Sequence, residues 1–280
     1  MNKTNIANDC PAGINDKKAN HTYSAFEKKT YYSTTTKSYR PVNILLPTDY
    51  EAEKKYPVLY FLHGIFGNED SMIGPENGAI YMPANLAQLG TVREMIIVCP
   101  NIYAQDKEGV TEGFHQEYFH GYNNFIKDLI NDLMPYMEQN YSIATGRENT
   151  ALCGFSMGGR TALYIGFSRP ELFGYIGAFS PAPGVVPGKD SNTTHIGLFS
   201  ENEFRIQNPD DTPYLTYISC GTKDSVVTTF PKSYHDILTR NNQPHVWVEV
   251  SEADHDDRAI RAGLYHFLSY ASEVRNKKFS

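Results

Sequence analysis

The stretch Ala151-Leu-Cys-Gly-Phe-Ser-Met-Gly-Gly159 predicts a short apolar strand, a tight turn at Ser156 and the start of a helix. Its centre, Gly154-Phe-Ser-Met-Gly158, has the G-x-S-x-G pattern of a nucleophile elbow, a sharp strand-to-helix turn that exposes a serine hydroxyl. The flanking glycines let strand and helix approach closely, and free N–H groups at the start of a helix stabilise negative charge. The stretch predicts a nucleophilic serine, although a glycine-rich turn with an incidental serine has the same pattern.

Strand-like and helix-like stretches alternate on both sides of this turn. Short apolar runs typical of buried strands occupy residues 57–62, 94–99, 174–179, 214–220 and 245–250. Helical patterns occupy residues 83–89, 122–139 and 230–239, and a last helix follows residue 257. Residues 23–37 and 40–47 read as an antiparallel hairpin. The sequence therefore predicts an α/β fold, with antiparallel N-terminal strands and a mostly parallel central sheet covered by helices on both faces.

The 280 residues suit one large α/β domain. Residues 1–22 are rich in Asn, Lys and Asp without periodicity, so we expect a flexible leader or linker there and a single domain over 23–280. Residues 101–121 and 184–213 also lack a clear period. Loops of this length are more often functional than decorative, so we expect them to bind substrate.

Composition excludes several classes of function. The formal net charge of −7 and the pI near 5.7 argue against a nucleic-acid partner or an anionic membrane surface. No apolar run is long enough to span a membrane. Residues 1–20 lack the apolar segment of a signal peptide, so the chain is either cytoplasmic or a mature secreted domain. Neither a P-loop nor a G-x-G-x-x-G motif is present, so nothing indicates a nucleotide cofactor.

A nucleophilic serine requires an imidazole to take its proton and a carboxylate to orient that imidazole. In this architecture the acid and then the histidine follow later strands of the sheet. Asp224 follows the strand ending at Cys220, and His255 follows the strand ending at Val250. These two residues are therefore the predicted partners of Ser156, although Asp224 could instead cap the following helix and His255 could belong to a solvated acidic loop.

Other residues could compete for these roles. His235 lies on a predicted helix, and His245 begins a strand, which places it at the wrong edge of the sheet. Asp254 and Asp256 are too close to His255 in sequence to be its obvious partner. The carboxylates that stay open as alternatives are those of Glu201 and Glu203 in the second long loop.

Two backbone N–H groups are needed to stabilise an oxyanion. The elbow geometry predicts that Met157 supplies one, and the loop after the 57–62 strand supplies the other from Ile65 or Phe66. We expect His63 to shape that loop rather than to act as a base.

A metal centre is not predicted. His115, Glu117 and His120 lie close together in sequence, but they follow neither H-E-x-x-H nor a zinc-finger spacing. We therefore predict neither a metal nor any other cofactor.

Taken together, these motifs resemble serine esterases of the α/β-hydrolase fold, in the group of esterase D and carbohydrate esterase family 1, and most closely the feruloyl esterases. The resemblance covers roughly residues 40–272, and its strongest segments are Tyr60-Phe-Leu-His-Gly-Ile-Phe-Gly67, Cys153-Gly-Phe-Ser-Met-Gly-Gly-Arg160, Phe173-Gly-Tyr-Ile-Gly-Ala-Phe-Ser-Pro181 and Ser219-Cys-Gly-Thr-Lys-Asp224. It implies a triad of Ser156, Asp224 and His255. These esterases often carry Gly-Gly-His-Asp at the histidine, where this chain has Ala253-Asp-His-Asp256, so loop geometry and local charge are expected to differ.

The resemblance implies a secreted feruloyl esterase that releases ferulate and related hydroxycinnamates from feruloylated arabinoxylan or small esters. Alternatives are an acetylxylan esterase, an intracellular thioesterase like S-formylglutathione hydrolase, a mycolyl-type acyltransferase, and a carbohydrate-binding protein with a decayed site. Aromatic residues in the two long loops are candidates for binding the phenolic ring or the sugars: Tyr103, Phe114, Tyr118 and Phe204.

Overall fold

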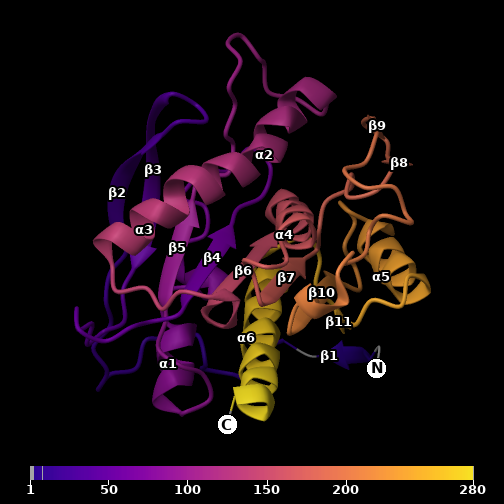
Figure 1. Ribbon diagram of the computed structural model, residues 1–280. Helices are drawn as coiled ribbons and strands as arrows, with labels where there is room; N and C mark the ends of the chain where they lie inside the picture. Colours follow the sequence, from indigo (N-terminus) through magenta and orange to yellow (C-terminus); the bar gives the residue numbers. More distant parts are fainter. Residues whose placement is uncertain (1–2, 8, 280) are drawn as a thin grey trace.

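The computed structural model describes residues 3–7 and 9–279, which fold around one large sheet (Figure 1). Within these residues the sheet has nine strands in the order β1-β11-β10-β7-β6-β4-β5-β3-β2. The strands are β1 (Lys3–Ala7), β2 (Glu27–Ser33), β3 (Ser38–Leu45), β4 (Val58–Leu62), β5 (Ile96–Pro100), β6 (Thr150–Phe155), β7 (Tyr175–Phe179), β10 (Leu215–Gly221) and β11 (Val246–Val250). A separate pair, β8 (Gly188–Lys189) and β9 (Thr194–His195), lies in the second long loop.

The helices lie between successive strands of the parallel part of the sheet, apart from α6, which follows β11. They are α1 (Met82–Gln88), α2 (Gln116–Asp128), α3 (Met134–Asn140), α4 (Met157–Ser168), α5 (Phe230–Arg240) and α6 (Asp257–Phe279), with short 3₁₀ turns at Pro75–Asn77, Arg147–Asn149 and Pro209–Asp211. A π-helical turn, Leu129–Leu133, joins α2 to α3. Pro135 has no N–H group to continue an α-helical ladder, which explains the wider turn just before it.

Strand directions confirm the predicted fold class. β4, β5, β6, β7, β10 and β11 pair in parallel, whereas β3 is antiparallel to both β2 and β5. Because the parallel strands run the same way, the loops that follow them share one edge of the sheet. Ser156, Asp224 and His255 all lie in such loops.

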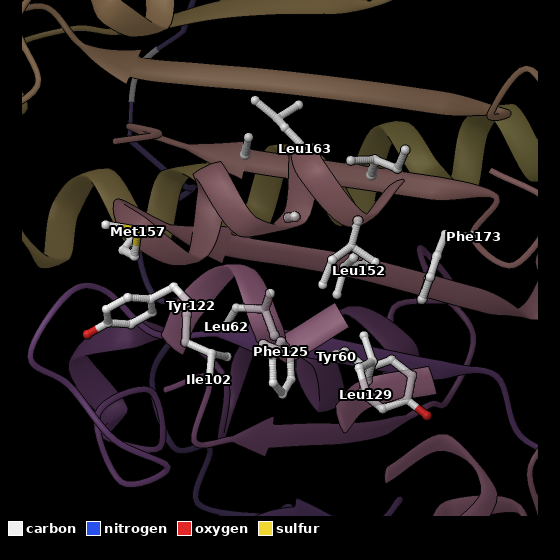
Figure 2. Packing of buried hydrophobic residues seen from close by; sticks show 14 of the residues in the cluster. Tyr60, Leu62, Ile102, Tyr122, Phe125, Leu129, Leu152, Met157, Leu163 and Phe173 are labelled. Carbon is white, nitrogen blue, oxygen red and sulfur yellow. The ribbon is translucent and has the colours of Figure 1, made fainter. Parts of the chain in front are cut away.

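Helices cover both faces of the sheet, and β4 shows how the sequence divides its side chains between them. Val58, Tyr60 and Leu62 join one buried cluster with residues of α2, α4 and α5. Leu59 and Phe61 point the other way and join a second cluster with α1 and α6. Figure 2 shows part of the first cluster, with Tyr122 and Met157 toward one end and Leu129 and Phe173 toward the other.

The N-terminal segment differs from the prediction of a flexible leader over 1–22. Lys3–Ala7 forms β1, which pairs in parallel with β11 at the edge of the sheet. Farther along, the Asn85 side chain on α1 donates hydrogen bonds to the carbonyls of Ile14 and Asp16, at 2.7 and 3.0 Å. The prediction is corrected for these residues. Their polar composition gave no strand pattern, because this strand is held by backbone pairing with β11. That 23–280 is the esterase domain stays our proposal.

The first long loop is shorter than predicted. We expected residues 101–121 to be irregular and a helix to begin at Tyr122, but α2 already begins at Gln116. His115 caps it, since its Nδ1 accepts a hydrogen bond from the Tyr118 N–H at 3.3 Å.

Across residues 3–7 and 9–279, none of the helices has the length and apolar character needed to cross a membrane.

Candidate active site

Ser156 occupies a strained turn between β6 and α4. Its backbone has φ of +55° and ψ of −117°, outside the regions that non-glycine residues ordinarily adopt. The Ser156 N–H donates to the Phe179 carbonyl at 2.9 Å, which fixes the turn against β7. A Cβ atom on Gly158 would lie 2.2 Å from the Leu62 carbonyl oxygen, and one on Gly154 would lie 2.5 Å from the backbone of Gly158. Only glycine fits at these two positions.

Asp224 and His255 are in direct contact. His255 Nδ1 lies 2.9 Å from Asp224 Oδ2, and their side chains are 11% and 1% exposed. The other oxygen, Oδ1, accepts from the N–H groups of Val226 and Val227 at 3.1 and 3.0 Å. Asp224 therefore holds a histidine and also shapes the loop before α5, but it does not cap that helix, whose N-cap residue is Thr229. Burial is the largest single influence and would raise the pKa of Asp224, but the hydrogen bond and charge of His255, together with hydrogen bonds from Val227 and Ser180, outweigh it and lower the pKa.

Further contacts hold this pair beside the elbow. Lys223 N–H donates to the Ala253 carbonyl at 3.0 Å, which ties the two loops together. The Asp254 carboxylate accepts from the N–H groups of Ser225 and His255, at 2.9 and 2.8 Å. The ring of Phe155, the residue before the serine, lies 4.3 Å from the His255 imidazole between centroids. The imidazole is thereby held against the end of β6.

The loop after β4 passes next to the serine. A Cβ atom on Gly64 would lie 3.4 Å from Ser156 Cβ, so this loop contacts the nucleophile closely. The two donors left open by the sequence differ here, because the Phe66 N–H donates to the Tyr122 hydroxyl at 3.0 Å. This favours Ile65 as the second oxyanion donor. Met157 begins α4, so its N–H has no acceptor within the helix.

His63 is buried beneath this loop and uses both ring nitrogens. Its Nε2 lies 2.9 Å from the Ile102 N–H and must accept, so Nδ1 carries the proton and donates to the Gly64 carbonyl at 2.7 Å. Burial lowers the pKa of His63 to about 4. His63 is therefore neutral at physiological pH and shapes the loop, as the sequence indicated.

This arrangement predicts a pH dependence of stability. The pKa of His63 is about 4 in the folded chain and about 6.5 when unfolded, so the unfolded state binds more protons between these values. The contribution is complete above pH 6.5 and falls as pH drops toward 4, by a total of about 3 kcal/mol. Urea unfolding of the wild type and His63→Gln at several pH values measures it. We expect the difference in unfolding free energy to shrink at low pH, with His21→Gln as control; parallel curves would contradict this.

The competing residues lie elsewhere. His235 Nδ1 and His245 Nε2 are 2.7 Å apart, and the His235 ring stacks on Trp247. Glu201 pairs with Arg240 on the exposed surface, and Glu203 accepts from Ser200. Neither glutamate is the partner of His255.

Three of the four aromatic candidates belong to one cluster around the loop after β4. Phe66 packs against Phe114 at 5.4 Å and against Tyr118 at 5.6 Å between ring centroids, and Tyr118 packs against Tyr103 at 4.5 Å. Phe66 and Phe114 are each 45% exposed, whereas Tyr118 is 2% exposed and packs against the Phe66 ring. The prediction that Phe204 binds substrate is corrected by the structure. It is fully buried against Phe167, Phe199 and Tyr234, so it belongs to the core and cannot reach a substrate.

Sequence reasoning missed two neighbours of the site. The Tyr122 hydroxyl that fixes Phe66 had no signal beyond an aromatic residue at a helical position. Arg160 is 4% exposed, and its guanidinium donates to Asn123 Oδ1 at 2.9 Å and contacts Met157 Sδ at 3.8 Å. Burial lowers the pKa of Arg160 to about 10, so it stays charged at neutral pH. Its position four residues after the serine was the available signal.

Comparison with known proteins agrees with this geometry. The family model named Esterase matches residues 33–279. A solved structure of a CE1 ferulic acid esterase from Anaeromyces mucronatus, in complex with ferulic acid, is 52% identical and superposes with a TM-score of 0.91 over 97% of this chain and 100% of that one. An endo-1,4-beta-xylanase/feruloyl esterase from Xylanibacter ruminicola is 29% identical over 71% of this chain. The match covers 25% of that relative, so the chain spans about a quarter of its length.

The chain therefore belongs to this esterase family and is a carboxylic ester hydrolase with the α/β-hydrolase fold. The predicted resemblance to carbohydrate esterase family 1 is confirmed by the 52% identity to the Anaeromyces enzyme. An S-formylglutathione hydrolase from Staphylococcus aureus is 17% identical with a TM-score of 0.65, and that likeness shows the shared fold alone.

Proposed function

We propose that the chain is a feruloyl esterase, which hydrolyses esters of ferulate and related hydroxycinnamates through an acyl-enzyme. The observation that carries the proposal is the 52% identity, along the whole chain, to a ferulic acid esterase whose structure contains ferulic acid. The Asp224–His255 pair beside the nucleophile elbow supports it. The xylanase/feruloyl esterase relative supports arabinoxylan as the natural substrate. Because a polysaccharide is too large to enter a cell, this substrate favours secretion over a cytoplasmic location.

In the first half of the proposed reaction, Ser156 Oγ bonds to the ester carbonyl carbon while its proton passes to His255 Nε2. Asp224 Oδ2 accepts the Nδ1–H of the resulting imidazolium. The carbonyl oxygen becomes an oxyanion, and the N–H groups of Met157 and Ile65 stabilise it. The tetrahedral intermediate collapses to the acyl-enzyme, and the sugar oxygen leaves with the proton from His255.

In the second half, water attacks the acyl carbon and gives its proton to His255. Collapse of the second tetrahedral intermediate returns that proton to Ser156 Oγ and releases the free acid. The buried Arg160 cation, in the first turns of α4, adds a fixed positive charge near the start of this helix, where its guanidinium lies 3.8 Å from Met157 Sδ.

The exposed pair Phe66 and Phe114 supplies a surface for the phenolic ring. Both side chains are half-exposed, and both belong to the cluster around the proposed oxyanion loop. An aromatic ring stacked on such a pair gains about 0.5–1.5 kcal/mol beyond its buried area.

Phe114→Ala is therefore expected to raise KM for methyl ferulate about fivefold and to leave kcat for p-nitrophenyl acetate unchanged. Steady-state kinetics on both esters measure the difference. Tyr39→Ala is the matched control, since Tyr39 is also an exposed aromatic residue but lies on the β2–β3 hairpin. Equal loss on both substrates would show that Phe114 does not hold the ring.

The decisive assay follows hydrolysis of methyl ferulate and p-nitrophenyl acetate side by side, with Ser156→Ala as the blank. Turnover of methyl ferulate supports a feruloyl esterase. Rapid cleavage of the acetate with methyl ferulate untouched would favour the alternative deacetylase or thioesterase. Product analysis with and without a sugar acceptor separates hydrolysis from acyl transfer, and xylan binding without any turnover would indicate a binding protein.

A further inference from the structure

A cavity lies at the opposite edge of the sheet from Ser156. Its volume is about 80 Å³, and its walls include Val58, Ala151 and Tyr175 at the starts of β4, β6 and β7. The last turns of α6 and residues 92–95 complete it. Because Ser156 follows the far end of β6, this cavity is separated from the proposed active site by the length of the parallel strands.

Two arginines line this cavity, and neither forms an ion pair with a carboxylate among residues 3–7 and 9–279. Arg93 makes one long hydrogen bond, from NH1 to Asn149 Oδ1 at 3.4 Å, and the Arg275 guanidinium lies 6.0 Å from the Phe279 ring centroid. Glu148 also lines the cavity, but in the described part of the chain it forms an ion pair with neither arginine. Burial and then the positive charge of Arg275 lower the pKa of Arg93. Two cations that repel each other in one cavity favour an anion between them.

Buried hydrogen-bond donors without partners among the described residues also favour a bound anion in this cavity. Tyr175 is 5% exposed, and its hydroxyl makes no hydrogen bond to any described residue. Arg275 Nε is likewise buried and unpaired among those residues. Burial raises the pKa of Tyr175 to about 12, so the hydroxyl keeps its proton and can donate. Leaving such donors unsatisfied costs about 1–3 kcal/mol each, and an anionic acceptor would remove that cost.

The remaining walls are apolar. Met95, Phe267, Leu268 and Ala271 face the cavity beside the arginines. Liquid water occupies about 30 Å³ per molecule, so about 80 Å³ holds an anionic head group and a short hydrocarbon tail. A fully hydrated inorganic anion would leave these apolar walls in contact with polar atoms.

We propose that this cavity binds a short-chain monocarboxylate of roughly two to four carbons. The carboxylate lies between Arg93 and Arg275 and accepts from the Tyr175 hydroxyl, and the alkyl chain packs against Phe267 and Leu268. This site is independent of the proposed esterase chemistry, because it shares no residue with it.

Calorimetric titration of the protein with butyrate tests the proposal. We expect saturable binding of one butyrate per chain and none of the uncharged analogue butyramide. Arg275→Gln should weaken binding at least tenfold, since it removes a charge-assisted hydrogen bond, and the conservative Tyr175→Phe should weaken it about threefold or more. Arg240→Gln, an exposed arginine on α5, is the matched control and should bind as the wild type.

A parallel titration of His255→Ala separates this cavity from the active site. Butyrate affinity should be unchanged there, because His255 lies at the other edge of the sheet. The proposal is overturned if butyrate does not bind, if sulfate binds as well as butyrate, if Arg275→Gln and Tyr175→Phe leave the affinity unchanged, or if His255→Ala abolishes binding.

Discussion

Ser156→Ala is expected to lower kcat for methyl ferulate by about 10⁴-fold or more, because no acyl-enzyme can form without the serine oxygen. The remaining rate would come from substrate binding and the oxyanion N–H groups alone. Alanine removes one oxygen atom and leaves the turn intact, since the hydrogen bond between Ser156 N–H and the Phe179 carbonyl belongs to the backbone. The unfolding free energy should therefore change little.

Two measurements check this prediction. Steady-state hydrolysis of methyl ferulate gives the rate, and a fluorophosphonate probe, which labels activated serines, should modify the wild type but not the variant. Ser168→Ala, at the other end of α4, should keep full activity and full labelling. If Ser156→Ala retains more than a trace of hydrolysis, the nucleophile lies elsewhere.

Asp224→Asn is expected to lower kcat by about 10⁴-fold while the chain stays folded. Oδ1 of Asp224 accepts from two backbone N–H groups, so the asparagine must keep its oxygen on that side. Its NH₂ group then faces His255 Nδ1, in place of the oxygen that lies 2.9 Å away in the wild type. A donor at that position stabilises the tautomer with the proton on Nε2, which cannot accept a proton from Ser156.

Asp224→Asn should therefore change the rate of hydrolysis much more than it changes the stability of the fold. The rate constant for methyl ferulate should fall steeply, whereas urea unfolding should change by no more than about 1 kcal/mol, because both loop hydrogen bonds persist. Asp224→Ala loses those bonds as well and should be the less stable of the two. Asp236→Asn, an exposed aspartate on α5, serves as the control. A rate within tenfold of the wild type would remove Asp224 from the mechanism.

The proposed triad was predictable because its signals are local or follow from topology. The glycines around Ser156 mark the turn by sterics alone. Asp224 and His255 are far apart in sequence, but each follows an apolar run, and parallel strands bring their carboxyl ends to one edge. The sequence therefore predicted this Asp–His contact without any distance information.

Other features depend on packing that no pattern encodes. Phe204 and Phe114 both lie in loops without periodicity, and only the folded chain shows that the first is buried and the second half-exposed. Positive φ angles at Phe66, Ser156, Ser180 and Glu252 occur in the loops that follow four strands, where tertiary contacts impose the strain. Of these four, only Ser156 carries a sequence motif.

The position of β1 also determines the order in which the sheet can be completed. Among the described strands Lys3–Ala7 pairs with β11 alone, so the first and last of these strands in sequence form this edge. Their contact closes a very long loop, which costs chain entropy. Assembly of the intervening strands shortens that loop, so β1 is expected to pair with β11 only afterwards. During synthesis β1 emerges from the ribosome long before β11, yet it is expected to dock only after Val250 has been synthesised.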